Sequence, residues 1–169
     1  MNKKTNIVLI GMPGSGKSTV GVLVAKALGM SFVDTDLELM RRTDRKLQEM
    51  LDEDGLESFL DEEETTILAL DVSHTVIATG GSVVLEPEAV KCLQENGILV
   101  FLDVSMEELK KRITNIKSRG IAFAKGQDLT DIYEERVPLY RKYADVVVDK
   151  EGDLENTVES VLSSSALPA

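Results

Sequence analysis

The sequence of 169 residues has few or none of several features that would mark particular classes of protein. It contains no tryptophan and a single cysteine, Cys92, which excludes an intramolecular disulfide framework and indicates a reducing compartment. Its only apolar run near the start is too short to cross a membrane and leads into a glycine-rich loop. We therefore expect a cytoplasmic protein. We also expect a monomer, with an oligomer as the alternative.

Basic residues are also scarce. The chain has 19 Lys and Arg against 30 Asp and Glu, so its net charge is −11 and its pI is about 4.6. Such a surface repels nucleic acids and anionic membranes, and neither is expected as a partner. An anionic substrate would have to bind in a local basic pocket, against the overall field of the protein.

Short apolar stretches alternate with helical patterns along the chain. The expected strands are 7–10, 31–33, 75–78, 98–102 and 144–148. This alternation predicts an α/β fold, in which helices cover both faces of a parallel sheet through right-handed crossovers. Because 169 residues suit a single core, we expect 1–169 to form one domain.

A glycine-rich stretch follows the first expected strand directly. Residues Gly11 to Ser18 match the pattern G-x-x-x-x-G-K-[ST] between a strand and a helix, which is the context of a phosphate-binding loop. Lys17 would reach the β- and γ-phosphates, and the Ser18 hydroxyl could ligate Mg²⁺. The alternative is a tight strand-to-helix turn without a ligand. The predicted nucleotide-binding residues of the loop are Gly14, Ser15, Gly16, Lys17, Ser18 and Thr19.

Two further motifs follow expected strands. Asp34 and Asp36 come after the second strand, and Gly80 and Gly81 come after the third. Because ligands on parallel sheets bind beyond the carboxyl ends of the strands, we expect both motifs to face the phosphate loop. The alternatives are that Asp36 only caps the next helix and that the glycines only permit a turn.

Four segments of the chain, in this order and spacing, resemble the shikimate kinases. They are Gly11–Thr19, Asp34–Asp36, Thr79–Gly81 and Arg136–Tyr140. The resemblance implies a three-layer P-loop kinase fold with a five-stranded parallel sheet in the order 2-3-1-4-5. It also implies transfer of a phosphoryl group, dependent on ATP and Mg²⁺, to the 3-hydroxyl of shikimate, a small hydroxylated carboxylic acid.

The resemblance also assigns roles to residues on the nucleotide side. Lys17 is expected to act in catalysis, and Arg112 is expected to lie beside the adenine. Ser18 and Asp34 are the expected Mg²⁺ residues, with Asp34 in the outer sphere. Asp36 is expected to bind the acceptor hydroxyls and to act in catalysis.

On the acceptor side, the resemblance implies that Gly80 and Gly81 line the site and that Arg136 grips the substrate carboxylate. A guanidinium offers a planar fork that matches a carboxylate. Pro138 predicts a kink or break of the helix just after Arg136, which would fix the direction of that side chain. A solvated helix residue is the alternative for Arg136.

A lid is expected at 115–129, within which Arg119 would neutralise charge on the transferred phosphoryl group. The alternative for Arg119 is a mobile, solvated side chain. The lid would follow a helix from Met106 to about Ile116, and residues 163–169 would form a flexible tail.

The chain departs from the family pattern at the acceptor site. Leu60 stands where the family has an arginine that helps to hold the shikimate carboxylate, Leu56 replaces an acidic residue, and Ser82 replaces a third glycine. The lid motif Arg-Pro-Leu-Leu is replaced by Arg119-Gly120-Ile121-Ala122. Position 60 would therefore provide an apolar wall instead of a bidentate donor.

Three hypotheses follow. The first is a small-molecule kinase with shikimate as the leading acceptor. The second keeps the fold and ATP chemistry but changes the acceptor to another hydroxy acid or a polyol. The third is a nucleotide-binding regulator without turnover, against which the presence of Lys17, Ser18, Asp34 and Asp36 speaks.

Overall fold

The computed structural model describes residues 3–114, 120–149 and 153–168. Five strands form one parallel sheet in the order β2-β3-β1-β4-β5, which confirms the predicted topology. The strands are β1 (Asn6–Ile10), β2 (Ser31–Asp34), β3 (Thr75–Ala78), β4 (Gly97–Asp103) and β5 (Val146–Asp149). The helices are α1 (Lys17–Leu28), α2 (Thr35–Thr43), α3 (Leu47–Leu68), η1 (Val83–Leu85), α4 (Pro87–Asn96), α5 (Met106–Arg112), α6 (Leu129–Tyr143) and α7 (Leu154–Leu162).

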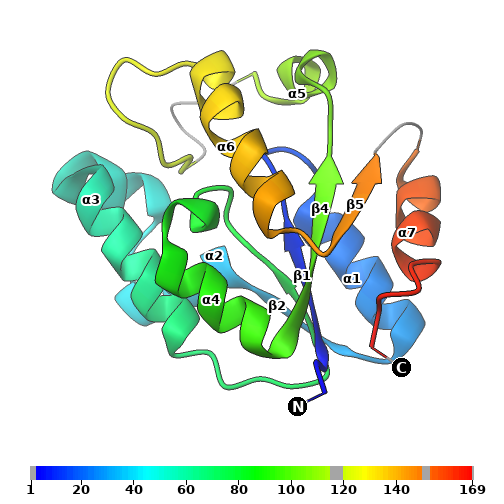
Figure 1. The fold of residues 1–169 in the computed structure, drawn as a ribbon. Coiled ribbons are helices and arrows are strands. Elements are labelled where there is room, and N and C mark those ends of the chain that lie inside the picture. Colours follow the sequence, from blue (N-terminus) through cyan, green and yellow to red (C-terminus); the bar gives the residue numbers. More distant parts are fainter. Residues whose placement is uncertain (1–2, 115–119, 150–152, 169) are drawn as a thin grey trace.

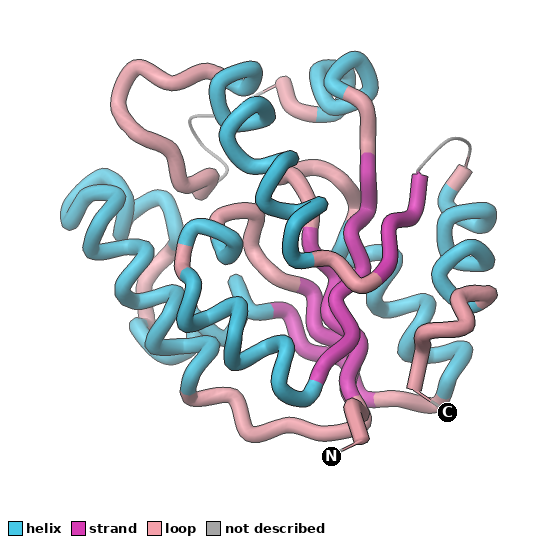
Figure 2. Tube along the Cα trace, in the orientation of Figure 1, coloured by secondary structure: helices cyan, strands magenta, loops and turns pink. Residues whose placement is uncertain are grey.

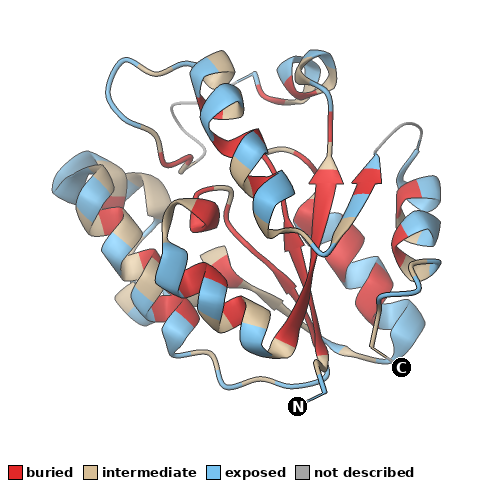
Figure 3. Ribbon diagram, in the orientation of Figure 1, coloured by how far each residue is buried: buried red, intermediate tan, exposed pale blue. Residues whose placement is uncertain are grey.

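Helices cover both faces of the sheet, as Figure 1 shows. Successive residues of a strand point to opposite faces, so the continuous apolar run of β4 serves two cores. Leu99 and Phe101 pack with α3, α4 and α6, whereas Val100 and Leu102 pack with α1 and α7. The buried central strands between exposed helix faces are visible in Figure 3. Among the described residues, no helix has both the length and the apolar character needed to cross a membrane.

Two sequence-based expectations about element boundaries are wrong, and one of the two alternatives predicted at Pro138 does not occur. The helix after Ser105 ends at Arg112 rather than near Ile116, because Ile113 turns into an extended conformation and is buried. The last strand begins at Val146 rather than Ala144. Of the kink or break predicted at Pro138, the break does not occur: α6 continues from Leu129 to Tyr143, since Ile132, Val137 and Tyr140 bury one side of it on both sides of the proline.

The carboxyl ends of β1, β2 and β3 lie next to one another at one edge of the sheet, as the tube in Figure 2 shows. The residues that follow these strands are the loop before α1, the start of α2 and the loop before η1. These are the segments that carry the phosphate-loop motif, the Asp pair and the glycine pair. The sheet order thus brings the three sequence motifs to one place.

Candidate active site

The loop between β1 and α1 has the backbone geometry of a phosphate cradle. Gly14 and Gly16 have φ angles of 79° and 87°, in the left-handed region that glycine adopts without strain. The helix α1 begins at Lys17, so its unpaired N–H groups and the positive end of its dipole face the loop. Both features favour an anion at this place.

Lys17 lies at the bottom of this loop and is 7% exposed. Its Nζ donates to the carbonyl oxygens of Gly11 at 2.8 Å and Met12 at 2.9 Å, and to Ser15 Oγ at 3.4 Å. Burial lowers the pKa of Lys17 to about 8, although the nearby carboxylate of Asp36 opposes this change. The lysine is therefore held ready beside the loop by backbone carbonyls.

Ser18 and Asp34 form an oxygen pair next to the loop. Ser18 Oγ donates to Asp34 Oδ2 at 2.5 Å. The other carboxylate oxygen of Asp34 accepts from the backbone N–H of Asp36 and Leu37, so Asp34 is the N-cap of α2. The capping role considered for Asp36 belongs to Asp34 instead, which leaves the Asp36 carboxyl group available for another partner.

Hydroxyl and carboxylate oxygens are the ligands that Mg²⁺ prefers. In the part of the chain that the structure describes, no group of three or more His, Cys, Asp or Glu side chains gathers to hold a metal. Ser18 and Asp34 therefore fit a Mg²⁺ ion that takes its remaining ligands from phosphate and water, rather than a site made by the protein alone.

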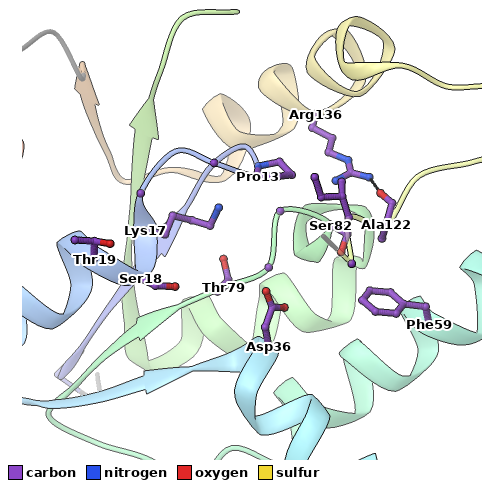
Figure 4. Close-up of a pocket in the computed structure, with 16 residues that line it drawn as sticks. Pro13, Lys17, Ser18, Thr19, Asp36, Phe59, Thr79, Ser82, Ala122 and Arg136 are labelled. Carbon is purple, nitrogen blue, oxygen red and sulfur yellow. Dashed lines mark hydrogen bonds between the residues drawn. The ribbon is translucent and has the colours of Figure 1, made fainter. Parts of the chain in front are cut away.

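A cavity of about 280 Å³ opens beside the loop, and Figure 4 shows the side chains around it. Most of the predicted site residues line it: Gly14, Gly16, Lys17, Ser18, Thr19, Asp36, Gly80, Gly81 and Arg136. Ser15, Asp34 and Arg112 are not among its lining residues. Arg112 instead contacts the loop from outside, since its Nη1 donates to the Gly14 carbonyl oxygen at 3.3 Å. Arg119 lies outside the described residues.

Asp36 projects from the first turn of α2 into the cavity (Figure 4). Burial raises its pKa to about 6, and the carboxylate of Asp34 adds to this rise while Lys17 opposes it. The carboxyl group lies close to the backbone of Gly80: a Cβ atom there would be 2.9 Å from Asp36 Oδ1 and 2.6 Å from Glu63 Oε2. Only glycine allows two carboxyl groups to approach the backbone this closely.

The glycine pair has structural partners as well as a place in the cavity wall. The N–H of Gly80 donates to Thr35 Oγ1 at 3.2 Å, so it is used within the protein rather than turned to a ligand. A Cβ atom on Gly81 would be 2.7 Å from Pro13 Cδ. Gly81 thus lets the phosphate loop and the segment after β3 come together, and its carbonyl oxygen accepts from the Tyr140 hydroxyl.

Arg136 closes the cavity on the side of α6. The side chain is 1% exposed, and its Nη2 donates to the carbonyl oxygen of Ala122. Its Nε and Nη1 atoms make no hydrogen bond with any described residue. Figure 4 shows the guanidinium over the cavity, opposite Asp36. Glu135 Oε1 lies 3.9 Å from Nε, which is an ion-pair distance but too long for a hydrogen bond. Buried donors without hydrogen bonds are costly, so this geometry suits an anionic ligand that would accept from them.

Other residues of the cavity were not predicted. Phe59, Ile121 and Ala122 form an apolar part of its wall, and the lining also includes Pro13, Thr79, Ser82 and Gly120. Phe59 and Ala122 belong to a small apolar cluster with Leu39 and Met50. Phe59 stands directly before Leu60, the position at which the family has an arginine, and this neighbourhood was the available signal for it. Ile121 and Ala122 lie within the predicted lid at 115–129, at the place where the family's lid motif is replaced.

Leu60 has a different place from the one expected. It packs against the apolar cluster of Leu39, Met50, Phe59 and Ala122, and it does not line the cavity. The apolar wall predicted at this position is provided by its neighbour Phe59. The side chain of Leu60 nevertheless brings no donor to this side of the pocket.

A phosphate loop that leads into a cavity, with an acidic group on one side and a buried cation on the other, defines a P-loop kinase of small molecules. Known proteins agree with this class. A family model described as shikimate kinase matches residues 13–166. The shikimate kinase of Thiobacillus denitrificans is 39% identical over 155 residues, covering 88% of this chain and 83% of the relative. That of Xylella fastidiosa is 33% identical over 165 residues, covering 96% and 92% of the two chains.

A solved structure gives the same result. The shikimate kinase from Acinetobacter baumannii in complex with shikimate superposes with a TM-score of 0.85 at 30% identity, covering 94% of this chain and 90% of that one. The chain therefore belongs to the shikimate kinase family. The sequence-based expectations of the fold and of a kinase are confirmed.

Proposed function

We propose that this protein transfers the γ-phosphoryl group of ATP to the 3-hydroxyl of shikimate, which yields shikimate 3-phosphate and ADP. The observation that carries this proposal is the buried Arg136, which lines the same cavity as the phosphate loop and whose Nε and Nη1 make no hydrogen bond with the described residues. The phosphate loop can thus bind a phosphate in this cavity, and Arg136 can bind the carboxylate of an acid there. The likeness to a shikimate kinase bound to shikimate supports the choice of acceptor.

On the nucleotide side, the loop residues Gly14 to Thr19 would bind the phosphates through backbone N–H groups and Lys17. Ser18 and Asp34 would hold Mg²⁺, Asp34 through water, and the ion would neutralise charge on the phosphates. Arg112, already bonded to the loop at Gly14, would lie beside the adenine. Arg119 would add positive charge from the lid at 115–129.

On the acceptor side, Arg136 would bind the carboxylate and Asp36 would bind the hydroxyl that is phosphorylated. Lys17 and Asp36 both line the cavity, so the hydroxyl and the γ-phosphate would meet between them. Because Asp36 is buried, it can orient the hydroxyl and accept its proton as the new bond forms. Catalysis would consist mainly of positioning and charge neutralisation.

A second acceptor class is the alternative, because the described residues that line the pocket include one arginine, Arg136, rather than two. Leu60 brings no donor from α3, and Phe59, Ile121 and Ala122 make the wall there apolar. An acid other than shikimate, or a polyol, could fit a pocket with less positive charge. A regulator without turnover is the least favoured of the three hypotheses, since the chain belongs to a kinase family.

The test is an ADP-release assay with ATP, Mg²⁺ and a panel of acceptors: shikimate, quinate and gluconate. We expect shikimate to give the highest kcat/KM. A higher value for another acid would favour the second hypothesis, and no acceptor-dependent ADP release would overturn the proposal. Phosphate transfer to the 3-hydroxyl would be checked by ³¹P and ¹H NMR of the product.

A further inference from the structure

The backbone at Gly120 makes a close contact with the start of α3. The N–H of Gly120 donates to Gln48 Oε1 at 3.1 Å. Gly120 has a φ angle of 66°, in the left-handed region, and a Cβ atom there would lie 2.5 Å from Leu47 Cβ. Glycine fits both the backbone angle and the space, so its presence at position 120 makes this contact possible.

The side chain of Gln48 is held in one orientation by a second hydrogen bond. Its Nε2 donates to Asp52 Oδ1 at 2.9 Å, one turn further along α3. An ionised carboxylate accepts hydrogen bonds and donates none, so the amide presents its NH₂ group to Asp52 and its oxygen to Gly120. Asp52, Gln48 and the Gly120 N–H therefore form a chain of hydrogen bonds in which donor and acceptor match at each step.

The residues after Gly120 connect this contact to the cavity. Ala122 lines the cavity, is 3% exposed and belongs to the apolar cluster formed by α2 and α3. Its carbonyl oxygen accepts from Arg136 Nη2, a hydrogen bond that Figure 4 draws. The segment 120–122 is thus held by Gln48 at one end and is bonded to Arg136 at the other.

The direction of the Arg136 guanidinium depends on this segment. Nη2 is tied to the Ala122 carbonyl, whereas Nε and Nη1 make no hydrogen bond with any described residue. A long side chain loses conformational freedom when it binds a ligand, and the cost is smaller when one of its atoms is already tied. Whatever fixes Ala122 therefore prearranges Arg136 for the ligand of its remaining donors.

We propose that Gln48 is a positioning residue for the acceptor: its amide oxygen holds the Gly120 N–H, and the segment 120–122 in turn holds Arg136 through the Ala122 carbonyl. Gln48 is not among the residues that line the cavity, so it acts through this segment and not by contact with the ligand.

The link depends on a departure of this chain from the family pattern. The pattern has proline where Gly120 stands, and proline has no N–H to donate and a φ angle near −65°. The binding of the acceptor by Arg136 rests on the proposed function, whereas the chain of hydrogen bonds from Asp52 to Gly120 does not.

The first test removes the amide that holds Gly120. Gln48→Ala should raise the acceptor KM about fivefold, because the net contribution of one hydrogen bond is lost, while kcat and the ATP KM should stay within about twofold of the wild type. The control is Gln94→Ala on α4, a partly buried glutamine that donates to the Tyr143 carbonyl oxygen. An unchanged acceptor KM in Gln48→Ala, an equal rise of the ATP KM or an equal change in the control would overturn the proposal.

A rescue variant separates positioning from a purely structural role. When Gln48→Glu is combined with Asp52→Asn, the amide and the carboxylate exchange places, and the carboxylate at position 48 can accept from the Gly120 N–H and from the amide at position 52. The acceptor KM should return to within about twofold of the wild-type value. A double variant as weak as Gln48→Ala would overturn the proposal, since both hydrogen bonds are still available in it.

Gly120 is tested against a glycine with the same backbone angle elsewhere. Gly120→Ala places a Cβ atom against Leu47, so the acceptor KM should rise at least as much as in Gln48→Ala. Gly29 at the end of α1 also has a φ angle of 66°, but a Cβ atom there would have no neighbour within 4 Å. Gly29→Ala therefore adds the backbone strain without the contact and should leave the acceptor KM unchanged.

The two changes at this contact should not be additive. Gly120→Ala combined with Gln48→Ala should be no weaker than Gly120→Ala alone, because both release the same segment. Additive losses in the double variant, or an equal loss in Gly29→Ala, would contradict the link between Gln48 and Arg136.

The arrangement of Arg136 is measured without any acceptor. The ¹H–¹⁵N signal of Arg136 Nε is identified by its loss in Arg136→Lys. It should shift in Gln48→Ala and stay in place in Gln94→Ala, because only the first variant releases the Ala122 carbonyl. An unchanged signal in Gln48→Ala would overturn the proposal whatever the acceptor is. A shifted signal in a protein that phosphorylates none of the acids would overturn the proposed function instead.

Discussion

The two halves of the pocket are built differently. In the phosphate half, the ligand-facing groups come from the loop after β1 and the first turn of α1, and Lys17 already has three hydrogen-bond partners there. The acceptor half takes its side chains from α2, α3, α6 and the loop before η1. Among the described residues, every buried side-chain polar atom without a hydrogen bond belongs to this half: Glu63 Oε2, Arg136 Nε and Arg136 Nη1.

This difference indicates that the choice of acceptor depends on the acceptor half of the pocket. A loop whose donors are backbone N–H groups can bind phosphate with almost any side chains around it. Buried polar atoms without partners are costly, and a ligand that satisfies them gains free energy that a poorly matched ligand does not. One substitution can therefore change the acceptor while the phosphate chemistry stays the same.

Removing the positive charge of Lys17 in the phosphate half should have the largest effect on catalysis. Lys17→Ala should lower kcat on the order of a thousandfold or more, about 4 kcal/mol, because the transferred phosphoryl group loses a charge in the transition state. The control is Lys26→Ala, an exposed lysine in the last turn of the same helix. Circular dichroism would confirm the fold, and a kcat close to that of the wild type would refute the role of Lys17.

Replacing Arg136, the cation of the acceptor half, should weaken binding of the acceptor far more than binding of ATP. Arg136→Ala should raise the acceptor KM on the order of a hundredfold, about 3 kcal/mol, with a much smaller change in the ATP KM. Arg141→Ala, an exposed arginine on the same helix, serves as the control. If the KM values of ATP and acceptor rose together, the two halves would not be separable as described.

The pH dependence of the free energy of unfolding should reveal the raised pKa of Glu63, the buried acid of the acceptor half. The folded-state pKa of Glu63, about 8, is above its ordinary value of 4.5, so between these values the folded state binds more protons and the wild type loses stability as pH rises. Glu63→Gln lacks this loss. Its stability relative to the wild type should increase by about 2 kcal/mol between pH 5 and pH 7, measured by urea unfolding. A constant difference would show that Glu63 titrates normally.

Restoring a donor to α3 should give the smallest of these effects. Leu60→Arg should lower the shikimate KM roughly tenfold, about 1.4 kcal/mol, since a second guanidinium can reach the acceptor or pair with Glu63. Leu68→Arg adds the same charge at an exposed position of the same helix and should change nothing. A wild type that already uses shikimate tightly, combined with a mutant without any gain, would disprove this account of the pocket.

The features that could be predicted from the sequence are mainly those encoded by neighbouring residues. The alternation of strands and helices and the phosphate loop follow from short-range signals, such as the β1 run followed directly by Gly11–Ser18. The strand order and the kinase class were instead expected from the resemblance to the shikimate kinases, and both are confirmed. Element boundaries were less certain, because they depend on packing. Ile113 leaves its helix to become buried, and α6 passes through Pro138 because its other residues pack on the sheet. The assigned roles of the site residues stay predictions.

By itself, the sequence determined that a parallel sheet would carry a phosphate loop and that Asp36, Gly80 and Arg136 would be candidates near it. Only the tertiary structure decided that Asp34 rather than Asp36 caps α2, that Leu60 packs away from the cavity and that Ser82 holds Glu63. The physical reason is the range of the interactions. Turns, strands and loops are encoded by neighbouring residues, whereas the burial and protonation of a side chain depend on groups that only folding brings beside it.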